Sequence, residues 1–139
     1  MKTLFTILLF VCSYALSAQV AGNYELTVNT KDRNVFEYKL TLSADGTFSF
    51  HYYSNIKNGI PPEKNYYGKG TWTVENNIVS FVSDKQADLD DKHTLDFSTS
   101  KARFHIKSNK GKTDKVLKTR LQFLTSEISW MKRVEVFKV

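Results

Sequence analysis

Apolar and polar residues alternate along most of this chain with a period of two. In residues 36–42 the polar side chains take one parity and the apolar ones the other: Phe36, Tyr38, Leu40 and Leu42. This is the pattern of a strand with one buried face. Asp45 and Gly46 follow, and glycine readily adopts the positive φ of a tight hairpin turn. The apolar parity then resumes at Phe48, Phe50 and Tyr52, so residues 36–52 are predicted to form a β-hairpin.

The remainder of the chain predicts further strands separated by turns. We expect strands at residues 67–74, 78–82, 93–97, 102–106, 116–124 and 128–139. Residues 55–65, which contain adjacent prolines, are expected to be a loop, and so are the acid-rich residues 84–92. The alternation changes phase between Trp130 and Phe137, which predicts a β-bulge near Met131, Lys132 and Arg133. About eight to ten short strands at this spacing predict an all-β sandwich or barrel.

Residues 1–18 have the organisation of a secretory signal peptide. Lys2 precedes an apolar run at residues 4–11, and small residues lead to an expected cleavage after Ala18. The run is shorter than the ~20 residues of a membrane-spanning helix. Cys12 follows Val11 where a lipoprotein signal requires a small residue, so lipidation is not favoured. The predicted product is a single exported domain, residues 19–139, in the periplasm or outside the cell, with no cysteine and no transmembrane segment.

Three short motifs, taken in order, resemble the lipocalin-like domains of small secreted bacterial proteins. They are a Gly-x-aromatic opening at Gly22-Asn23-Tyr24, a turn at Asp45-Gly46-Thr47-Phe48, and a strand that begins Gly70-Thr71-Trp72. The resemblance covers nearly all of residues 19–139. It implies an antiparallel up-and-down β-barrel, in which the Gly-x-Trp elements are largely structural. Glycine permits close backbone approach, and the following aromatic residue closes the end of the barrel.

Positive charge is concentrated in the last part of the chain. Residues 101–139 contain eleven Lys and Arg against three acids, whereas acids outnumber bases by eleven to eight in residues 19–100. In two successive predicted strands, the alternate positions that face away from the apolar side carry basic residues: Lys101, Arg103, His105, Lys107, Lys118 and Arg120. If these strands pair, they form one basic face, with Lys110, Lys112 and Lys115 at its turn. Such a face suits phosphates, anionic glycans or lipid headgroups, or it simply keeps exposed strands soluble.

The sequence offers little support for catalysis or cofactor binding. His51, His93 and His105 lack the short spacing of a metal pair, and the acidic loop lacks the order of a calcium-binding loop. No serine lies in a Gly-x-Ser-x-Gly motif, and Gly68-Lys69-Gly70 lacks the spacing of a phosphate-binding loop. We therefore expect no enzyme, no metal and no cofactor. Nucleic acid is not expected either, because the aromatic residues take the inward parity and the protein is predicted to be exported.

Two functions from different classes remain open. The first is a binding protein whose barrel holds a small apolar or amphipathic ligand against inward aromatics such as Phe36, Tyr38, Phe50 and Trp72. The second is an interaction module with a filled core. It contacts an anionic envelope surface or a partner protein through the basic face of residues 101–122, which we call the basic hairpin. Small barrels can fill their interior with side chains, so the aromatic residues fit either alternative.

Overall fold

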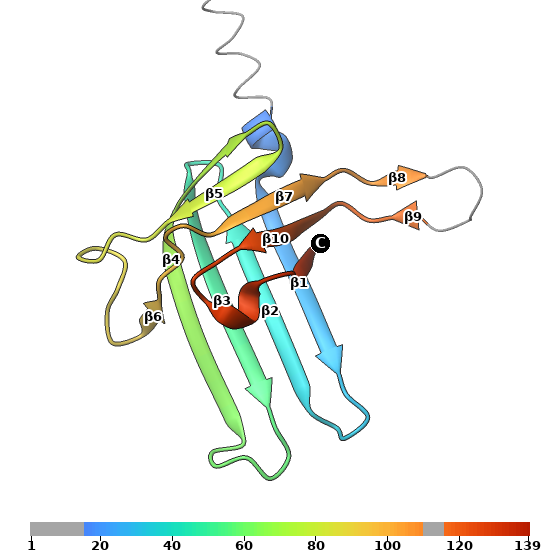
Figure 1. The fold of residues 1–139 in the computed structure, drawn as a ribbon, viewed down its shortest axis with the longest axis vertical. Coiled ribbons are helices and arrows are strands. Elements are labelled where there is room, and N and C mark those ends of the chain that lie inside the picture. The colour runs from blue at the N-terminus through green and yellow to red at the C-terminus, as the bar shows by residue number, and fades with distance from the viewer. Residues whose placement is uncertain (1–15, 110–115) are drawn as a thin grey trace, which may run out of the picture.

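The computed structural model describes residues 16–109 and 116–139 (Figure 1). The strands within them are β1 Gly22–Asn29, β2 Val35–Leu42, β3 Thr47–Asn55, β4 Glu63–Glu75, β5 Ile78–Val82, β6 His93–Leu95, β7 Lys101–His105, β8 Ser108–Asn109, β9 Val116–Leu117, β10 Arg120–Thr125 and β11 Glu135–Lys138. Helical structure in the described residues is limited to one turn at residues 16–20 and the 3-10 helix η1, Ser129–Met131.

Eight of these strands close into an antiparallel barrel. The order is β3-β2-β1-β11-β10-β7-β5-β4, and a further pairing of β3 with β4 closes the ring. Each of the eight strands therefore pairs with the barrel strand before it and the barrel strand after it along the chain, and β11 pairs with β1. This confirms the predicted antiparallel β-barrel. The strand β6 adds to β4 in parallel, and β8 pairs with β9 in a separate two-stranded ladder. Figure 1 shows this ladder extending away from the barrel as an arm.

The predicted hairpin of residues 36–52 is confirmed by the pairing of β2 with β3, in a register that runs from Val35–Asn55 to Leu42–Phe48. Gly46 has a φ of 89°, and its N–H donates to the Ser43 carbonyl at 3.0 Å. Asp45 Oδ1 accepts hydrogen bonds from the hydroxyl and the N–H of Thr47, which lower the pKa of the Asp45 carboxyl. The turn residues therefore fix the register of both strands.

Several local predictions are wrong. The expected loop at residues 55–65 is shorter, because β4 already begins at Glu63 and pairs there with Asn55. The expected bulge near Met131 is instead the helix η1, followed by Arg133 at a φ of 68°. Both devices change the phase of a strand, but η1 also turns the chain so that Met131 is buried. Of the expected final strand, only β11 pairs in the sheet.

Aromatic side chains fill the closed half of the barrel. Five phenylalanine rings lie 5.0–6.0 Å from one another, centre to centre, in mostly edge-to-face pairs: Phe48, Phe50, Phe81, Phe97 and Phe123. All five are at most 3 % exposed. Tyr24 is also fully buried, and its hydroxyl donates to the carbonyl of Val20. The helical turn at residues 16–20 thus places Val20 in the core, whereas Cys12 and most of the predicted leader lie outside the described residues.

The strands of the barrel are unequal in length, which leaves one end open. β1 to β4 contain 8, 8, 9 and 13 residues, whereas β5, β7, β10 and β11 contain 5, 5, 6 and 4. Within the described residues, 26–29 of β1 pair only with β2, and 63–66 of β4 pair only with β3. The outer halves of β1 to β4 therefore extend past the barrel as a four-stranded sheet (Figure 1). We call this sheet the open end.

Candidate functional site

The inner face of the open end carries a row of one leucine and three tyrosines across its four strands. Leu26 of β1 lies opposite Tyr38 of β2, which lies opposite Tyr52 of β3, which lies opposite Tyr66 of β4. The rings of Tyr38 and Tyr52 are 5.2 Å apart in an edge-to-face pair, and Tyr52 and Tyr66 are stacked at 6.0 Å. Phe36 lies two residues further out on β2 and is half-buried. These five residues continue the barrel's inward face beyond its core.

Trp130 packs onto this row from outside the four strands. It belongs to η1, and its ring lies 4.5 Å from Tyr52, 6.1 Å from Tyr38 and 6.3 Å from Phe50. Trp130 remains 37 % exposed, and Tyr66 at the other side of the row is 38 % exposed. Leu26, Phe36, Tyr38, Tyr52, Tyr66 and Trp130 together form what we call the aromatic shelf. The shelf offers aromatic faces to solvent next to a packed core.

The four residues predicted to contact a ligand occupy two different places. Phe36 and Tyr38 lie on the aromatic shelf, half-buried. Phe50 and Trp72 lie in the core, 2 % and 5 % exposed. The indole Nε1 of Trp72 donates to the Ser43 carbonyl at 2.9 Å, so this tryptophan is held by the β2–β3 turn. The structure therefore does not bring the four residues together in one lining.

Sequence reasoning did not select Tyr52, Tyr66 or Trp130. The alternation marked Tyr52 as inward, but nothing local distinguishes an inward residue under the barrel from one beyond it. Tyr66 fell in the residues just before the strand expected at 67–74. Trp130 reaches the row only because η1 replaces the expected bulge. A signal was nevertheless available for two of them, because Tyr52 and Tyr66 have the inward parity of Phe48, Phe50 and Trp72.

The predicted basic face is formed, but one of its charges is compensated. β7 and β10 pair with Arg120 opposite His105 and Gln122 opposite Arg103. The Arg120 guanidinium lies 3.4 Å from the Glu135 carboxylate of β11, and His105 Nε2 lies 3.2 Å from Gln122 Oε1. The side chains of Lys101, Arg103, Lys107 and Lys118 are exposed. Lys110, Lys112 and Lys115 lie outside the described residues.

The remaining histidines and acids make local structural contacts. The His51 ring stacks on Tyr67 at 4.5 Å, and His93 Nδ1 lies 3.0 Å from Asp90 Oδ1. Asp90 also accepts the backbone N–H of His93, which lowers its pKa to about 2. Among residues 16–109 and 116–139, no three His, Cys, Asp or Glu side chains are grouped so that they could hold a metal ion.

Comparison with known proteins gave no relative. No family model matches this chain, and neither the curated proteins nor the solved structures compared with it gave a match. No helix in the described part of the chain is long and apolar enough to cross a membrane.

Proposed function

We propose that this protein is a non-enzymatic binding protein that holds a small apolar or amphipathic ligand on its aromatic shelf. The observation that carries the proposal is the row from Leu26 through Tyr38 and Tyr52 to Tyr66, covered in part by Trp130. Binding sites for small molecules are typically concave and aromatic, with few polar groups that set orientation.

The chemistry of the shelf favours an amphipathic ligand over a purely charged one. Tyrosine and tryptophan rings offer apolar faces and carry one polar group each. The Tyr38 phenol is protonated at neutral pH, as any tyrosine is, and can donate a hydrogen bond; burial, and then the proximity of Tyr52, raise its pKa further. Because the phenylalanines pack ring against ring in the closed half, the ligand is expected at the open end rather than deep in the barrel.

The alternative function, an interaction module that uses the basic hairpin, rests on a different observation. Lys101 and Arg103 of β7 are exposed, and so are Lys107, which follows β7, and Lys118, which precedes β10. The ion pair between Arg120 and Glu135 reduces the charge of this face, and exposed lysines also protect strands from edge-to-edge aggregation. We therefore place this function second. Export through residues 1–18 is part of either proposal and is tested by sequencing the amino terminus of the secreted protein.

The test compares two adjacent tyrosines of β4 that lie on opposite faces. Tyr66→Ser removes an exposed ring from the shelf, whereas the control, Tyr67→Ser, removes a ring that stacks on His51 outside it. Binding is measured with dodecanoate by displacement of anilinonaphthalene sulfonate, and native mass spectrometry of the purified protein reports any retained ligand. Loss of one aromatic contact is expected to weaken dodecanoate binding by about fivefold to tenfold.

The control variant is expected to bind dodecanoate as the wild-type protein does. Equal loss in both variants would indicate that stability of the strand, rather than the shelf, governs binding. A wild-type protein that retains no ligand and binds neither probe would refute the proposal. If Tyr66→Ser still binds dodecanoate and binding is abolished by Lys101→Gln and Arg103→Gln, the result would favour the basic hairpin.

A further inference from the structure

An isoleucine side chain projects from the tip of the open end into solvent. Ile60 lies in the turn between β3 and β4 and is 97 % exposed, and Pro61 and Pro62 beside it are also exposed. The turn is held by hydrogen bonds from Ile56 N to the Pro62 carbonyl at 2.8 Å and from Gly59 N to the Ile56 carbonyl at 2.9 Å. A single exposed aliphatic residue needs no special explanation. Whether Ile60 belongs to a binding surface therefore depends on the residues around it.

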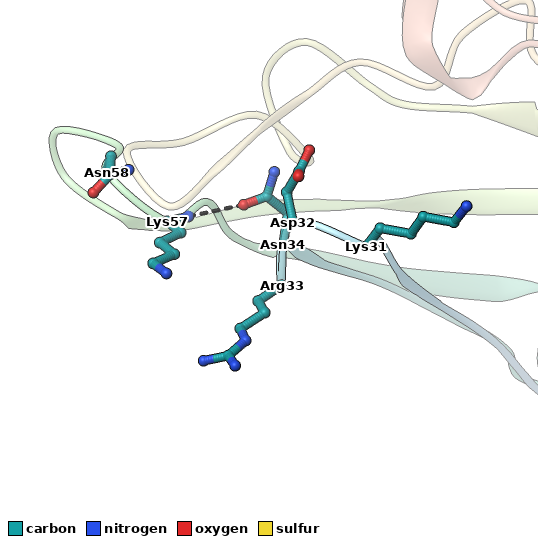
Figure 2. A pocket seen from close by; sticks show the side chains of 6 residues that line it. All are labelled: Lys31, Asp32, Arg33, Asn34, Lys57 and Asn58. Carbon is teal, nitrogen blue, oxygen red and sulfur yellow. Dashed lines mark hydrogen bonds between the residues drawn. The ribbon is translucent and has the colours of Figure 1, made fainter.

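Positive side chains occur in both turns at this end of the sheet. Lys57 lies in the same turn as Ile60, and Lys31 and Arg33 lie in the adjacent turn between β1 and β2. A polar notch between the two turns is lined by Lys31, Asp32, Arg33, Asn34, Lys57 and Asn58 (Figure 2). The Lys57 N–H donates to Asn34 Oδ1 at 2.9 Å, which ties the two turns together. Figure 2 shows the side chains of Arg33 and Lys57 extending to one side, while that of Asp32 points the other way. Neither Asp32 nor Glu63, the acids of these two turns, forms an ion pair with Arg33 or Lys57 in the described residues.

The aromatic shelf leads directly to this tip. On the inner face, the row one step further out runs from Phe36 of β2 to Ser54 of β3 and Lys64 of β4. Tyr66, at 38 % exposed, lies two residues from Lys64 on the same face. One end of the molecule thus combines a projecting aliphatic side chain, aromatic rings and several cations. This is the composition of surfaces that bind at the interface of a membrane with anionic lipids.

We propose that the protein docks reversibly, through this tip, on an anionic lipid bilayer. Ile60 enters the boundary between headgroups and acyl chains, and Lys31, Arg33 and Lys57 contact the headgroups, so that the aromatic shelf opens toward the membrane. A lipid surface fits this tip better than a protein does, because a stable protein interface takes about 800 Å² from each partner with good shape complementarity. A narrow tip with one aliphatic side chain suits a fluid surface that needs no matching shape.

The proposal is tested by co-sedimentation of the full chain with phosphatidylcholine vesicles, with and without phosphatidylglycerol. Each lysine or arginine near an anionic surface contributes about fivefold to the partition coefficient, so Arg33→Gln with Lys57→Gln lowers binding by about 25-fold. Ile60→Ser, at an exposed position, lowers binding by about fivefold or more without changing the fold. The matched control removes two charges from β7 with Lys101→Gln and Arg103→Gln, and leaves binding unchanged. Added salt weakens binding of the wild-type protein to the anionic vesicles.

Several results would overturn the proposal. These are a wild-type protein that does not bind the anionic vesicles, binding that is equal on neutral vesicles, and tip variants that bind as the wild-type protein does. Binding lost in the Lys101 and Arg103 variant instead would assign the membrane contact to the basic hairpin. Because Tyr66→Ser tests the shelf with soluble dodecanoate and Ile60→Ser tests the tip with vesicles, failure of one proposal is distinguishable from failure of the other.

Discussion

Gly70 is expected to be irreplaceable even by alanine, since the chain leaving β5 crosses directly over it. A Cβ built on Gly70 would lie 2.0 Å from the Val82 carbonyl oxygen and 2.9 Å from a carbon of the Phe48 ring. The oxygen belongs to the backbone and cannot rotate away, and Phe48 is 3 % exposed among other phenylalanines. The pairing of Thr71 with Val82 must therefore open by more than ~1 Å to reach ordinary contact distance.

The cost of Gly70→Ala follows from these two contacts. Overpacking a filled core costs about 1–3 kcal/mol, and a weakened ladder hydrogen bond adds about 1 kcal/mol, so we expect a destabilisation of about 3 kcal/mol. Urea unfolding followed by far-UV circular dichroism measures the change. With a slope of about 1–3 kcal/mol per molar urea, the midpoint falls by roughly 1–3 M. The control is Thr71→Ala, an exposed neighbour on the same strand whose replacement costs less than about 1 kcal/mol.

The result that refutes this reasoning is a Gly70→Ala midpoint equal to that of Thr71→Ala. It would mean that β5 shifts away from β4 without loss of pairing, and that the glycine of the Gly-Thr-Trp motif is not required for close approach. A large loss in both variants would instead point to β4 as a generally fragile strand, and would also remove the support for the contact argument.

Three further outcomes are expected. Between pH 9 and 12, the wild-type protein loses more stability than Tyr24→Phe in urea titrations, because burial raises the folded-state pKa of Tyr24 above 10.0. The stability that the neutral phenol provides is complete below pH 10 and is lost as pH rises, so equal pH dependence of the two proteins would contradict this expectation. Below about pH 4, the stability of Asp90→Asn falls less steeply with pH than that of the wild-type protein, because hydrogen bonds from His93 lower the folded-state pKa of Asp90 from 3.8 to about 2. The stability that the ionised carboxylate provides is lost as pH falls, so an unchanged acid-unfolding curve would argue against this role of Asp90. Dodecanoate shifts the tryptophan emission of wild type but not of Trp130→Phe, because the remaining Trp72 is 5 % exposed in the core; a persisting shift would place the ligand near Trp72.

The sequence predicted those parts of the fold that depend on local pattern. Strict alternation and the Asp45-Gly46 turn were enough to predict the hairpin of β2 and β3, because one buried face and a short turn favour this pairing. The two basic parities left open whether their strands pair, and the structure pairs β7 with β10, with Arg120 opposite His105. The start of β4 was missed because Glu63 and Lys64 show no apolar alternation there. Their strand structure comes from backbone pairing with β3.

The candidate site was predicted only in part, since it depends on where other strands end. Phe36 and Tyr38 have the same parity as Leu40 and Leu42, yet only the last two are fully buried. The difference arises because β11 pairs with β1 only at Tyr24 and Glu25, so that residues 26–29 of β1 have no partner on that side among the described strands. No local pattern in β2 reports that distant boundary. The inward parity was therefore predictable, whereas the division into core and shelf was not.

The open end is hard to explain as a contribution to stability. At about 3.3 Å per residue, β4 extends for roughly 43 Å, whereas β11 spans roughly 13 Å, so the outer part of the sheet has edges that no other strand covers. Unpaired edges expose the backbone to aggregation, and Glu63 and Lys64 place charges on one of them, as protected edges do. A barrel selected only for stability would shorten β1 to β4 to match their partners. Since these strands instead carry partly exposed aromatic residues past the core, their extra length is better explained by what the aromatic shelf and the tip contact.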